Sequence, residues 1–244
     1  MSAEHKATEA PLATSDTPPE RPAQPAGPPA KPHPSVGIIL REHRALSAML
    51  RSITLLLSEH RRRNTLPDFD ALQAMLFYVD EFPEKLHHPK ESRLLFARLR
   101  GHDAHTDEVL DRLDSDHARG EHAIRELQHS LLGFRLMSET AQGAARREQF
   151  ETLMKQYADF YLEHMRVEET EILPLAKTVL SAAEWDELDT AFLQNRDPLA
   201  GHEADEAYRP LFSKIVAALK RSGGVGSALE AFAGAALLPS PPMK

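Results

Sequence analysis

The sequence contains no cysteine among its 244 residues. This absence excludes disulfide scaffolds, zinc ribbons, iron–sulfur clusters and thiol catalysis, because all of them need cysteine sulfur. Any transition-metal site in this chain must therefore use nitrogen and oxygen ligands. The 13 histidines are the obvious source of nitrogen ligands.

The chain also lacks the basic surplus of a nucleic-acid-binding protein. It has 29 Lys and Arg against 37 Asp and Glu, a net charge of -8, so few cations are available to neutralise phosphates. Long hydrophobic runs are absent too, and the most apolar segment, residues 228–238, is too short to span a membrane. No apolar run follows the start, as it would in a signal peptide. We therefore expect a soluble, cytoplasmic protein without a nucleic-acid or membrane partner.

Proline is concentrated at the N-terminus, where residues 1–34 hold nine of the 18 prolines. This segment has almost no large apolar side chains, so it cannot bury enough surface to offset its ordering entropy. We expect residues 1–34 to be a disordered tail and residues 222–244 to be a flexible one. The intervening chain is long enough to form one hydrophobic core.

Apolar residues recur at helical spacing almost everywhere between 35 and 221, and no strand alternation or glycine-rich phosphate loop is present. Four long amphipathic segments with short connections predict an all-α fold, an up-down-up-down four-helix bundle over residues 35–180. Two additional helices are expected in a C-terminal extension over residues 181–221. The four long helices are predicted at about 35–62, 67–99, 106–131 and 144–180.

Prolines lie inside two of these helical patterns. Each one removes a backbone donor and crowds the preceding turn. We expect Pro83 and Pro89 to kink the second helix and Pro174 to interrupt the fourth.

Each long helix carries one histidine on its apolar row, and three of these histidines have a glutamate four residues later. A spacing of four places both side chains on one helix face, and the faces of a bundle converge in its interior. The lone histidine is His43, and the pairs are His87 with Glu91, His117 with Glu121, and His164 with Glu168.

The glutamates decide between a structural and a metal-binding interpretation. A lone histidine on an apolar row is more often a hydrogen-bonded core residue than a ligand. A buried carboxylate without a partner costs several kcal/mol, so such groups are normally paired or bind a metal. No Lys or Arg lies on the same rows to neutralise Glu91, Glu121 and Glu168. The pattern favours a metal site over a structural bundle with paired acids.

These residues fall into a recognisable order. The first helix carries His43; His87-His88-Pro89-Lys90-Glu91 comes before Leu94-Leu95-Phe96; His117 follows; and His164 and Glu168 come before Ile172-Leu173-Pro174. Over residues 35–180 the sequence resembles the hemerythrin-like HHE cation-binding family. The resemblance implies a four-helix bundle with two non-haem iron ions, bridged by an oxo or hydroxo group. It also implies that Glu91 and Glu168 bridge the irons, while His43, His87, His117 and His164 are terminal ligands.

Two positions differ from the oxygen-carrying members of that family. The carriers have a second histidine four residues after the one on the third helix, where this chain has Glu121. We expect Glu121 to be a metal ligand, and a harder, anionic donor should stabilise ferric iron. The carriers also place the last carboxylate five residues after its histidine, whereas Glu168 lies four after His164 and Glu169 lies five after it. Both differences argue against simple reversible oxygen carriage.

His60 is on the row of the first helix but more than four turns from His43, so it should lie at the bundle end, and His5 and His33 belong to the tail. The other six histidines, His88, His102, His105, His122, His129 and His202, lie off the rows or in connections, and we expect them to be exposed or hydrogen-bonded. Tyr157 lies two turns before His164 on the same face, and we expect it to be a core residue.

Two classes of function follow from a di-iron centre. The first is a protein that binds or senses O2, NO, peroxide or iron itself. The second is an oxidoreductase that turns over peroxide or oxidises ferrous iron. Both need an open coordination position, so the ligands alone do not separate them. The expected partner is a small diatomic molecule or peroxide, and the pattern assigns no protein partner or self-association.

Overall fold

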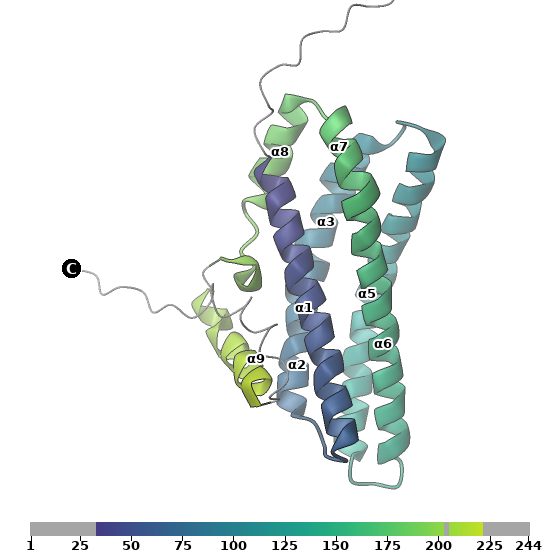
Figure 1. Cartoon of the computed structure of the whole chain (residues 1–244), viewed down its shortest axis with the longest axis vertical. Helices are drawn as coiled ribbons and strands as arrows, with labels where there is room; N and C mark the ends of the chain where they lie inside the picture. Colours follow the sequence, from purple (N-terminus) through teal and green to yellow (C-terminus); the bar gives the residue numbers. More distant parts are fainter. Residues whose placement is uncertain (1–32, 203–204, 222–244) are drawn as a thin grey trace, which may run out of the picture. The chain divides into compact units, whose positions relative to one another are not determined.

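The computed structural model describes residues 33–202 and 205–221, and this part of the chain is helical and contains no strand (Figure 1). The two expected tails fall outside the described residues, except for His33 and Pro34. None of the described helices combines the length and the apolar character that crossing a bilayer requires.

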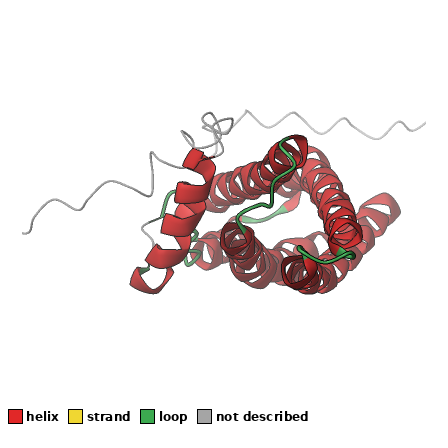
Figure 2. Ribbon diagram, turned by 90° about the horizontal axis from the view of Figure 1, so that it is seen from below, coloured by secondary structure: helices red, strands yellow, loops and turns green. Residues whose placement is uncertain are grey.

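Four long helices form the predicted bundle, with short connections between consecutive members (Figures 1 and 2). The first is α1 (Pro34–Arg62). The second consists of α2 (Phe69–Val79), η1 (Asp80–His87), α3 (His88–Lys90), η2 (Glu91–Phe96) and α4 (Ala97–Leu99). The third is α5 (Ala104–Met137), and the fourth consists of α6 (Gly143–Val167), η3 (Glu168–Ile172) and α7 (Leu173–Val179). The predicted all-α bundle is confirmed.

Side-chain caps explain where two of these helices begin. The carboxylate of Asp68 accepts a hydrogen bond from the Ala71 backbone N–H at 3.0 Å, just before α2. Asp103 accepts one from the Thr106 N–H at 2.8 Å, just before α5. Each aspartate satisfies a backbone donor that has no partner within its helix.

The second and fourth helices contain π-helical segments, namely η1, η2 and η3. A π-helical turn is closed by i→i+5 hydrogen bonds, so it holds more residues than an α-helical turn and shifts the register of the side chains. Pro83 lies within η1, where the chain stays helical. Pro174 lies in the first turn of α7, a position that tolerates a missing N–H. The α-helical pattern of the fourth helix is thus interrupted by η3 directly before Pro174, and the chain stays helical to Val179.

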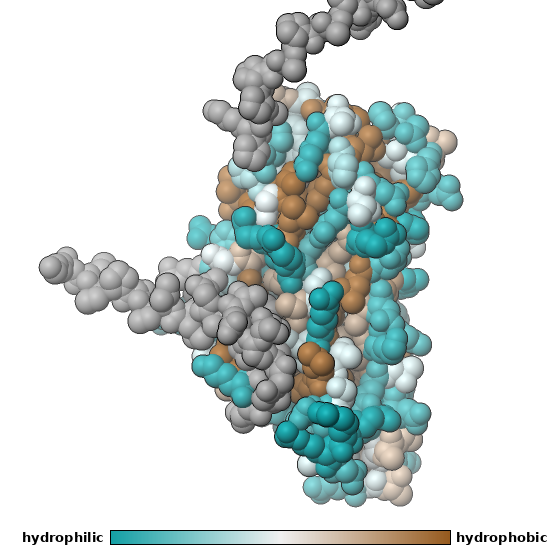
Figure 3. Space-filling model, viewed as in Figure 1, coloured by the Kyte–Doolittle hydropathy of each residue, from teal (hydrophilic) through white to brown (hydrophobic). Residues whose placement is uncertain are grey.

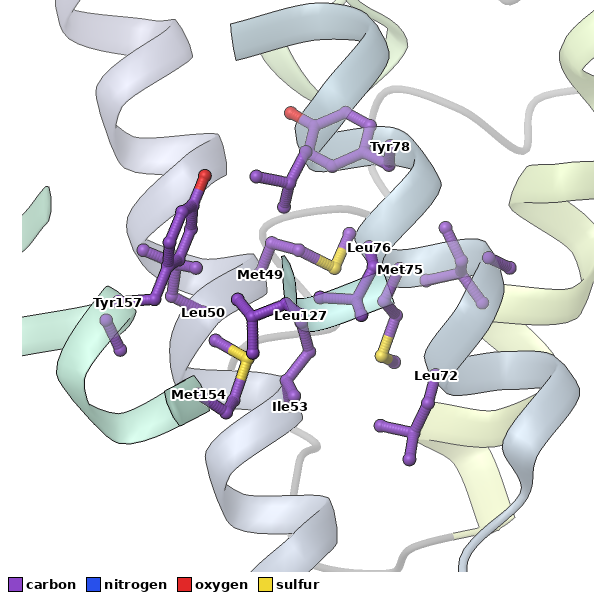
Figure 4. Packing of buried hydrophobic residues seen from close by; sticks show 14 of the residues in the cluster. Met49, Leu50, Ile53, Leu72, Met75, Leu76, Tyr78, Leu127, Met154 and Tyr157 are labelled. Atoms are coloured by element: carbon purple, nitrogen blue, oxygen red, sulfur yellow. The ribbon is translucent and has the colours of Figure 1, made fainter. Parts of the chain in front are cut away.

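The buried apolar residues form two clusters that follow one another along the bundle. One contains buried apolar residues between positions 45 and 57 of α1 and between positions 150 and 165 of α6, of which Figure 4 shows Met49 and Met154 among others. The other contains residues 36–39 of α1 and residues 167–176 of the fourth helix. On each of the four long helices, the predicted histidine lies at or next to the junction of the two clusters. The fold thus places these histidines in the middle of the bundle.

The C-terminal extension adds the two predicted helices, α8 (Ala182–Phe192) and α9 (Arg209–Arg221), with short 3-10 turns η4 (Pro198–Ala200) and η5 (Glu206–Tyr208) between them. α8 contributes Trp185, Leu188 and Phe192 to the second cluster. Its Asp189 accepts hydrogen bonds from the backbone N–H and hydroxyl of Ser35, at the start of α1. α9 lies outside the four-helix ring and packs against α2 (Figure 2). α8 is therefore an integral part of the packed bundle.

Hydrophilic side chains cover much of the face shown in Figure 3, with apolar patches between them. Large apolar side chains that are exposed within the described residues include Leu55, Leu66, Phe77, Leu86, Leu132, Leu136, Val179 and Leu193. They come from several different helices.

Candidate metal centre

Six of the seven predicted ligands are buried and meet in the middle of the bundle. They form two groups that share Glu91, and within each group the candidate ligand atoms lie within 4.8 Å of one another. One group is His43, His87 and Glu91, and the other is Glu91, His117, His164 and Glu168.

The four imidazoles form two pairs with their Nε2 atoms facing each other. The Nε2 atoms of His43 and His87 are 3.2 Å apart, and those of His117 and His164 are 3.0 Å apart. Four helices contribute one ring each, so the two pairs exist only in the folded bundle.

Glu91 reaches both imidazole pairs with its two carboxylate oxygens. Its Oε1 lies 3.1 Å from His87 Nε2 and 3.7 Å from His43 Nε2. Its Oε2 lies 3.6 Å from His117 Nε2. One carboxylate therefore spans the two pairs.

Glu168 spans the same two pairs from the fourth helix. Its Oε2 lies 3.3 Å from His43 Nε2, and its Oε1 lies 3.2 Å from His164 Nε2. The site thus consists of two imidazole pairs joined by two carboxylates, each with one oxygen toward each pair.

The outer nitrogens of His43, His87 and His117 are hydrogen-bonded to side-chain oxygens, whereas that of His164 has an ion-pair contact and no hydrogen bond. His43 Nδ1 lies 3.0 Å from Glu169 Oε1, and His87 Nδ1 lies 2.7 Å from Glu42 Oε2. A carboxylate partner fixes the proton on Nδ1 and leaves the Nε2 lone pair for the interior. In the other pair, His117 Nδ1 lies 2.9 Å from Ser92 Oγ and His164 Nδ1 lies 3.6 Å from Asp116 Oδ2.

The two spanning carboxylates need a cation. None of the four oxygens of Glu91 and Glu168 has a hydrogen-bond partner, although both side chains are fully buried. Burial and the charge of Glu91 oppose ionisation of Glu168, but His164 and His43 outweigh them and lower its pKa to about 2. Buried, ionised oxygens without hydrogen bonds are the donors that a metal ion satisfies. The residues present fit such an ion.

Two of the imidazoles, those of His87 and His164, show the same demand for positive charge. Burial opposes protonation of His87, but Glu91 and Glu42 raise its pKa to about 10. Burial likewise opposes protonation of His164, and Glu168 with Asp116 raises its pKa to about 9. Protons on these rings balance the carboxylates when no metal is bound, and a bound metal must displace them.

Glu121 is not part of the cluster. Its side chain is 56% exposed, and its Oε1 accepts a hydrogen bond from Arg125 at 2.8 Å. The neighbouring Gly120 faces the interior instead, against Tyr161. The expectation that Glu121 faces the site is therefore wrong, because α5 turns this position toward solvent.

His88 is the site residue that the sequence pattern missed. It is buried, and one of its ring nitrogens lies within 4.8 Å of a ring nitrogen of His117 and of one of His164. Its ring stacks on His117 with 4.4 Å between centroids and on Tyr161 with 5.1 Å. His87 and His88 are both buried, as are the consecutive residues Glu42 and His43 on α1, so a row that counts one residue per turn omits one of them. Pro83 and Pro89 were the signal in the sequence that this helix departs from a regular α-helix.

A buried glutamate, Glu84, hydrogen-bonds to His88. The Nδ1 of His88 donates to Glu84 Oε2 at 3.2 Å. Glu84 Oε1 accepts hydrogen bonds from the hydroxyls of Tyr157 at 2.6 Å and Tyr161 at 2.7 Å. Burial alone would raise the pKa of Glu84, but His88 and the two hydroxyls lower it. Tyr157 is a core residue, as expected, and it also belongs to this network.

Comparison with known proteins gives one match. Residues 35–176 match the family Hemerythrin, described as the hemerythrin HHE cation binding domain. No curated protein and no solved structure matches the chain. The matched range includes every residue of the buried histidine and glutamate cluster and ends before α8. This chain belongs to the hemerythrin HHE cation-binding domain family.

Proposed function

We propose that this protein is a cytoplasmic, non-haem di-iron protein that binds or senses O2, NO, peroxide or iron. One observation carries the proposal. Glu91 and Glu168 each direct one oxygen to each of two imidazole pairs. A carboxylate that reaches two sets of nitrogen donors is suited to bridging two metal ions, and carboxylate and imidazole donors suit iron.

The donors divide into two unequal halves. His43 and His87 would hold one ion, and His117 and His164 would hold the other, with His88 as a third imidazole in the second half. The His43–His87 half has fewer protein donors, so it is the half with room for a small ligand. When bound, the irons supply the redox and ligand-binding chemistry. An oxo or hydroxo bridge between them completes the proposed cofactor.

The protein's own contribution is to hold and shield the ions. The carboxylates neutralise their charge, and the outer partners orient the rings. Phe96, which is fully buried, stacks on His117 with 5.5 Å between centroids. The third helix lacks the second histidine of the oxygen carriers, and His88 would supply a fifth imidazole in its place. The donor set therefore does not need Glu121.

A di-iron oxidoreductase is the second candidate. Tyr157 and Tyr161 favour it, because two buried phenols share Glu84 beside His88. Phenols are oxidisable, and the carboxylate can accept a proton. Such an enzyme would turn over peroxide or oxidise ferrous iron at the same centre.

Metal analysis combined with an absorption spectrum tests the proposal. Protein purified with iron present should hold about two irons per chain and show near-ultraviolet oxo-to-iron bands that disappear on reduction. Zinc alone, or about one metal per chain, would contradict the di-iron assignment. Sustained consumption of hydrogen peroxide would favour the oxidoreductase, whereas a single stoichiometric oxidation would favour binding or sensing.

A further inference from the structure

Asn195 links the C-terminal extension to the metal centre. It lies beyond residues 35–176, which the family match covers, and it is 2% exposed. Its Nδ2 donates to Glu42 Oε2 at 3.0 Å. The same oxygen accepts a hydrogen bond from His87 Nδ1 at 2.7 Å. Two hydrogen bonds, both to Glu42, thus connect Asn195 with His87, although Asn195 lies 108 positions later in the sequence.

The buried Glu42 needs this support. Its carboxylate is almost fully buried, and a buried charge is costly unless it is paired and hydrogen-bonded. The ammonium of Lys90 donates to the side-chain oxygen of Asn195 and, at 3.0 Å, to the carbonyl oxygen of Ala191. Asn195 therefore stands between the Lys90 cation and the Glu42 anion and hydrogen-bonds to both.

The chain around Asn195 is held in place on both sides. Phe192 precedes it and is fully buried in the second apolar cluster. Asp197 follows it and accepts hydrogen bonds from the Tyr78 hydroxyl at 2.7 Å and the Leu199 N–H at 2.8 Å. These anchors fix the position of the Asn195 side chain relative to the bundle.

A small cavity marks the same junction. Its volume is about 10 Å³, and its lining includes Glu42, His43, His87, Asn195 and Asp197. This is space for about one water molecule. The extension therefore forms part of the wall beside the His43–His87 half of the centre, the half with fewer imidazoles.

We propose that Asn195 is a positioning residue of the metal centre, which holds Glu42 against His87 and so makes the C-terminal extension part of the His43–His87 half. This role rests on the proposed di-iron function. Without the Asn195 donor, Glu42 can turn away and His87 loses the acceptor that orients its ring. His117 and His164 have separate partners, Ser92 and Asp116. The effect should therefore be confined to one iron.

The test compares two amide-to-acid substitutions in the full-length chain. Asn195→Asp keeps the shape and the acceptor for Lys90 but replaces the donor to Glu42 with a carboxylate oxygen. Gln194→Glu makes the same chemical change at the adjacent, exposed position. Both proteins are loaded with ferrous iron without oxygen, and release to a chromogenic chelator is followed. We expect Asn195→Asp to release one iron about 10 to 100 times faster and the other at the wild-type rate. Gln194→Glu should match the wild type.

A double variant that exchanges the Glu42 carboxylate and the Asn195 amide distinguishes a positioning role of Asn195 from a general packing role. In the double variant Glu42→Gln with Asn195→Asp, the amide introduced at 42 can accept from His87 and donate to the carboxylate introduced at 195. We expect the fast phase to slow toward the wild-type rate. If Asn195 only supported packing, the second substitution would accelerate iron release further. Asn195→Ala removes the same donor without adding a charge and should show the same fast phase, so the test does not depend on one variant folding.

The outcomes distinguish the two proposals. A wild-type chain that takes up no iron refutes the di-iron function and the positioning role together. An iron-loaded wild type with unchanged release in Asn195→Asp and Asn195→Ala refutes the positioning role alone. Equal acceleration of both irons, or no recovery in the double variant, also refutes it.

Discussion

Gly120 of α5 lies directly against the hydroxyl of Tyr161: a Cβ on Gly120 would come within 1.7 Å of Tyr161 Oη. Only glycine leaves room for this contact. The same hydroxyl donates to Glu84, which accepts from His88. A missing side chain on α5 therefore allows the network behind His88 to form.

Gly120→Ala should destabilise the protein, because Tyr161 must move and lose its hydrogen bond to buried Glu84. Overpacking of this kind costs about 1–3 kcal/mol. Gly133→Ala is the matched control on the same helix, where the nearest side-chain atom to a new Cβ is 3.8 Å away. The control should gain about 0.5–1 kcal/mol from reduced backbone entropy. Urea unfolding measures both, and an equal gain in the two variants would show that Tyr161 moves without cost.

His88 should be needed for iron retention, because it is the third imidazole beside His117 and His164. We expect His88→Ala to weaken iron binding at least about tenfold. His122→Ala is the control, since His122 is exposed on α5. Iron content after dialysis against a graded series of chelator concentrations gives the comparison. Equal retention in the two variants would remove His88 from the proposed ligand set.

Glu91→Gln should change the stability of the iron-loaded protein more than that of the metal-free protein. The loaded form should lose iron and melt at a lower temperature, because a bridging charge is gone. The metal-free form should lose less stability than the loaded form, because His87 loses one buried partner but keeps Glu42 as an acceptor. Glu121→Gln should change neither form, since Glu121 is on the surface. Scanning calorimetry with and without iron checks both. A drop in the metal-free form alone would indicate a structural role for Glu91.

The sequence was sufficient to predict the bundle and most of the buried cluster of histidines and glutamates. His43, His117 and His164 lie on regular α-helical stretches, so a 3.6-residue period placed them correctly. His87, Glu91 and Glu168 were also found, although they lie in π-helical turns. The i,i+4 spacing within each pair still held them on one face.

The errors have specific physical causes. The apolar row of the second helix counts one inward residue per turn, so it omits His88, which is buried next to His87. Glu121 was assigned inward because its neighbour Gly120 has no side chain to mark the buried face. Asn195 could not be found by any local pattern, since its partner Glu42 is 153 residues away. A helical period shows which face of a single helix is apolar. A contact such as that of Asn195 with Glu42 depends instead on how segments far apart in the sequence pack together.

Asp197 should make the stability of the protein depend on pH. Its carboxyl is almost fully buried, and burial raises its pKa from the ordinary 3.8 to about 7, even though the Tyr78 hydroxyl donates to it. The charge of Glu42 acts in the same direction as burial. The folded protein therefore holds this proton up to a higher pH than the unfolded chain does. Its contribution to stability is complete below pH 3.8 and is lost as the pH rises toward 7.

Asp197→Asn should remove that dependence while keeping an acceptor for the Leu199 N–H. Relative to the variant, the wild type should lose stability between pH 4 and 7 by at most about 1.4 kcal/mol per pH unit. Asp205→Asn is the control, because Asp205 is an exposed acid that caps η5 of the same extension. Urea unfolding of the metal-free proteins at several pH values measures the difference, and the metal-site histidines cancel because all three proteins share them. Parallel curves for wild type and Asp197→Asn across this range would mean that Asp197 is already ionised in the folded protein at pH 4.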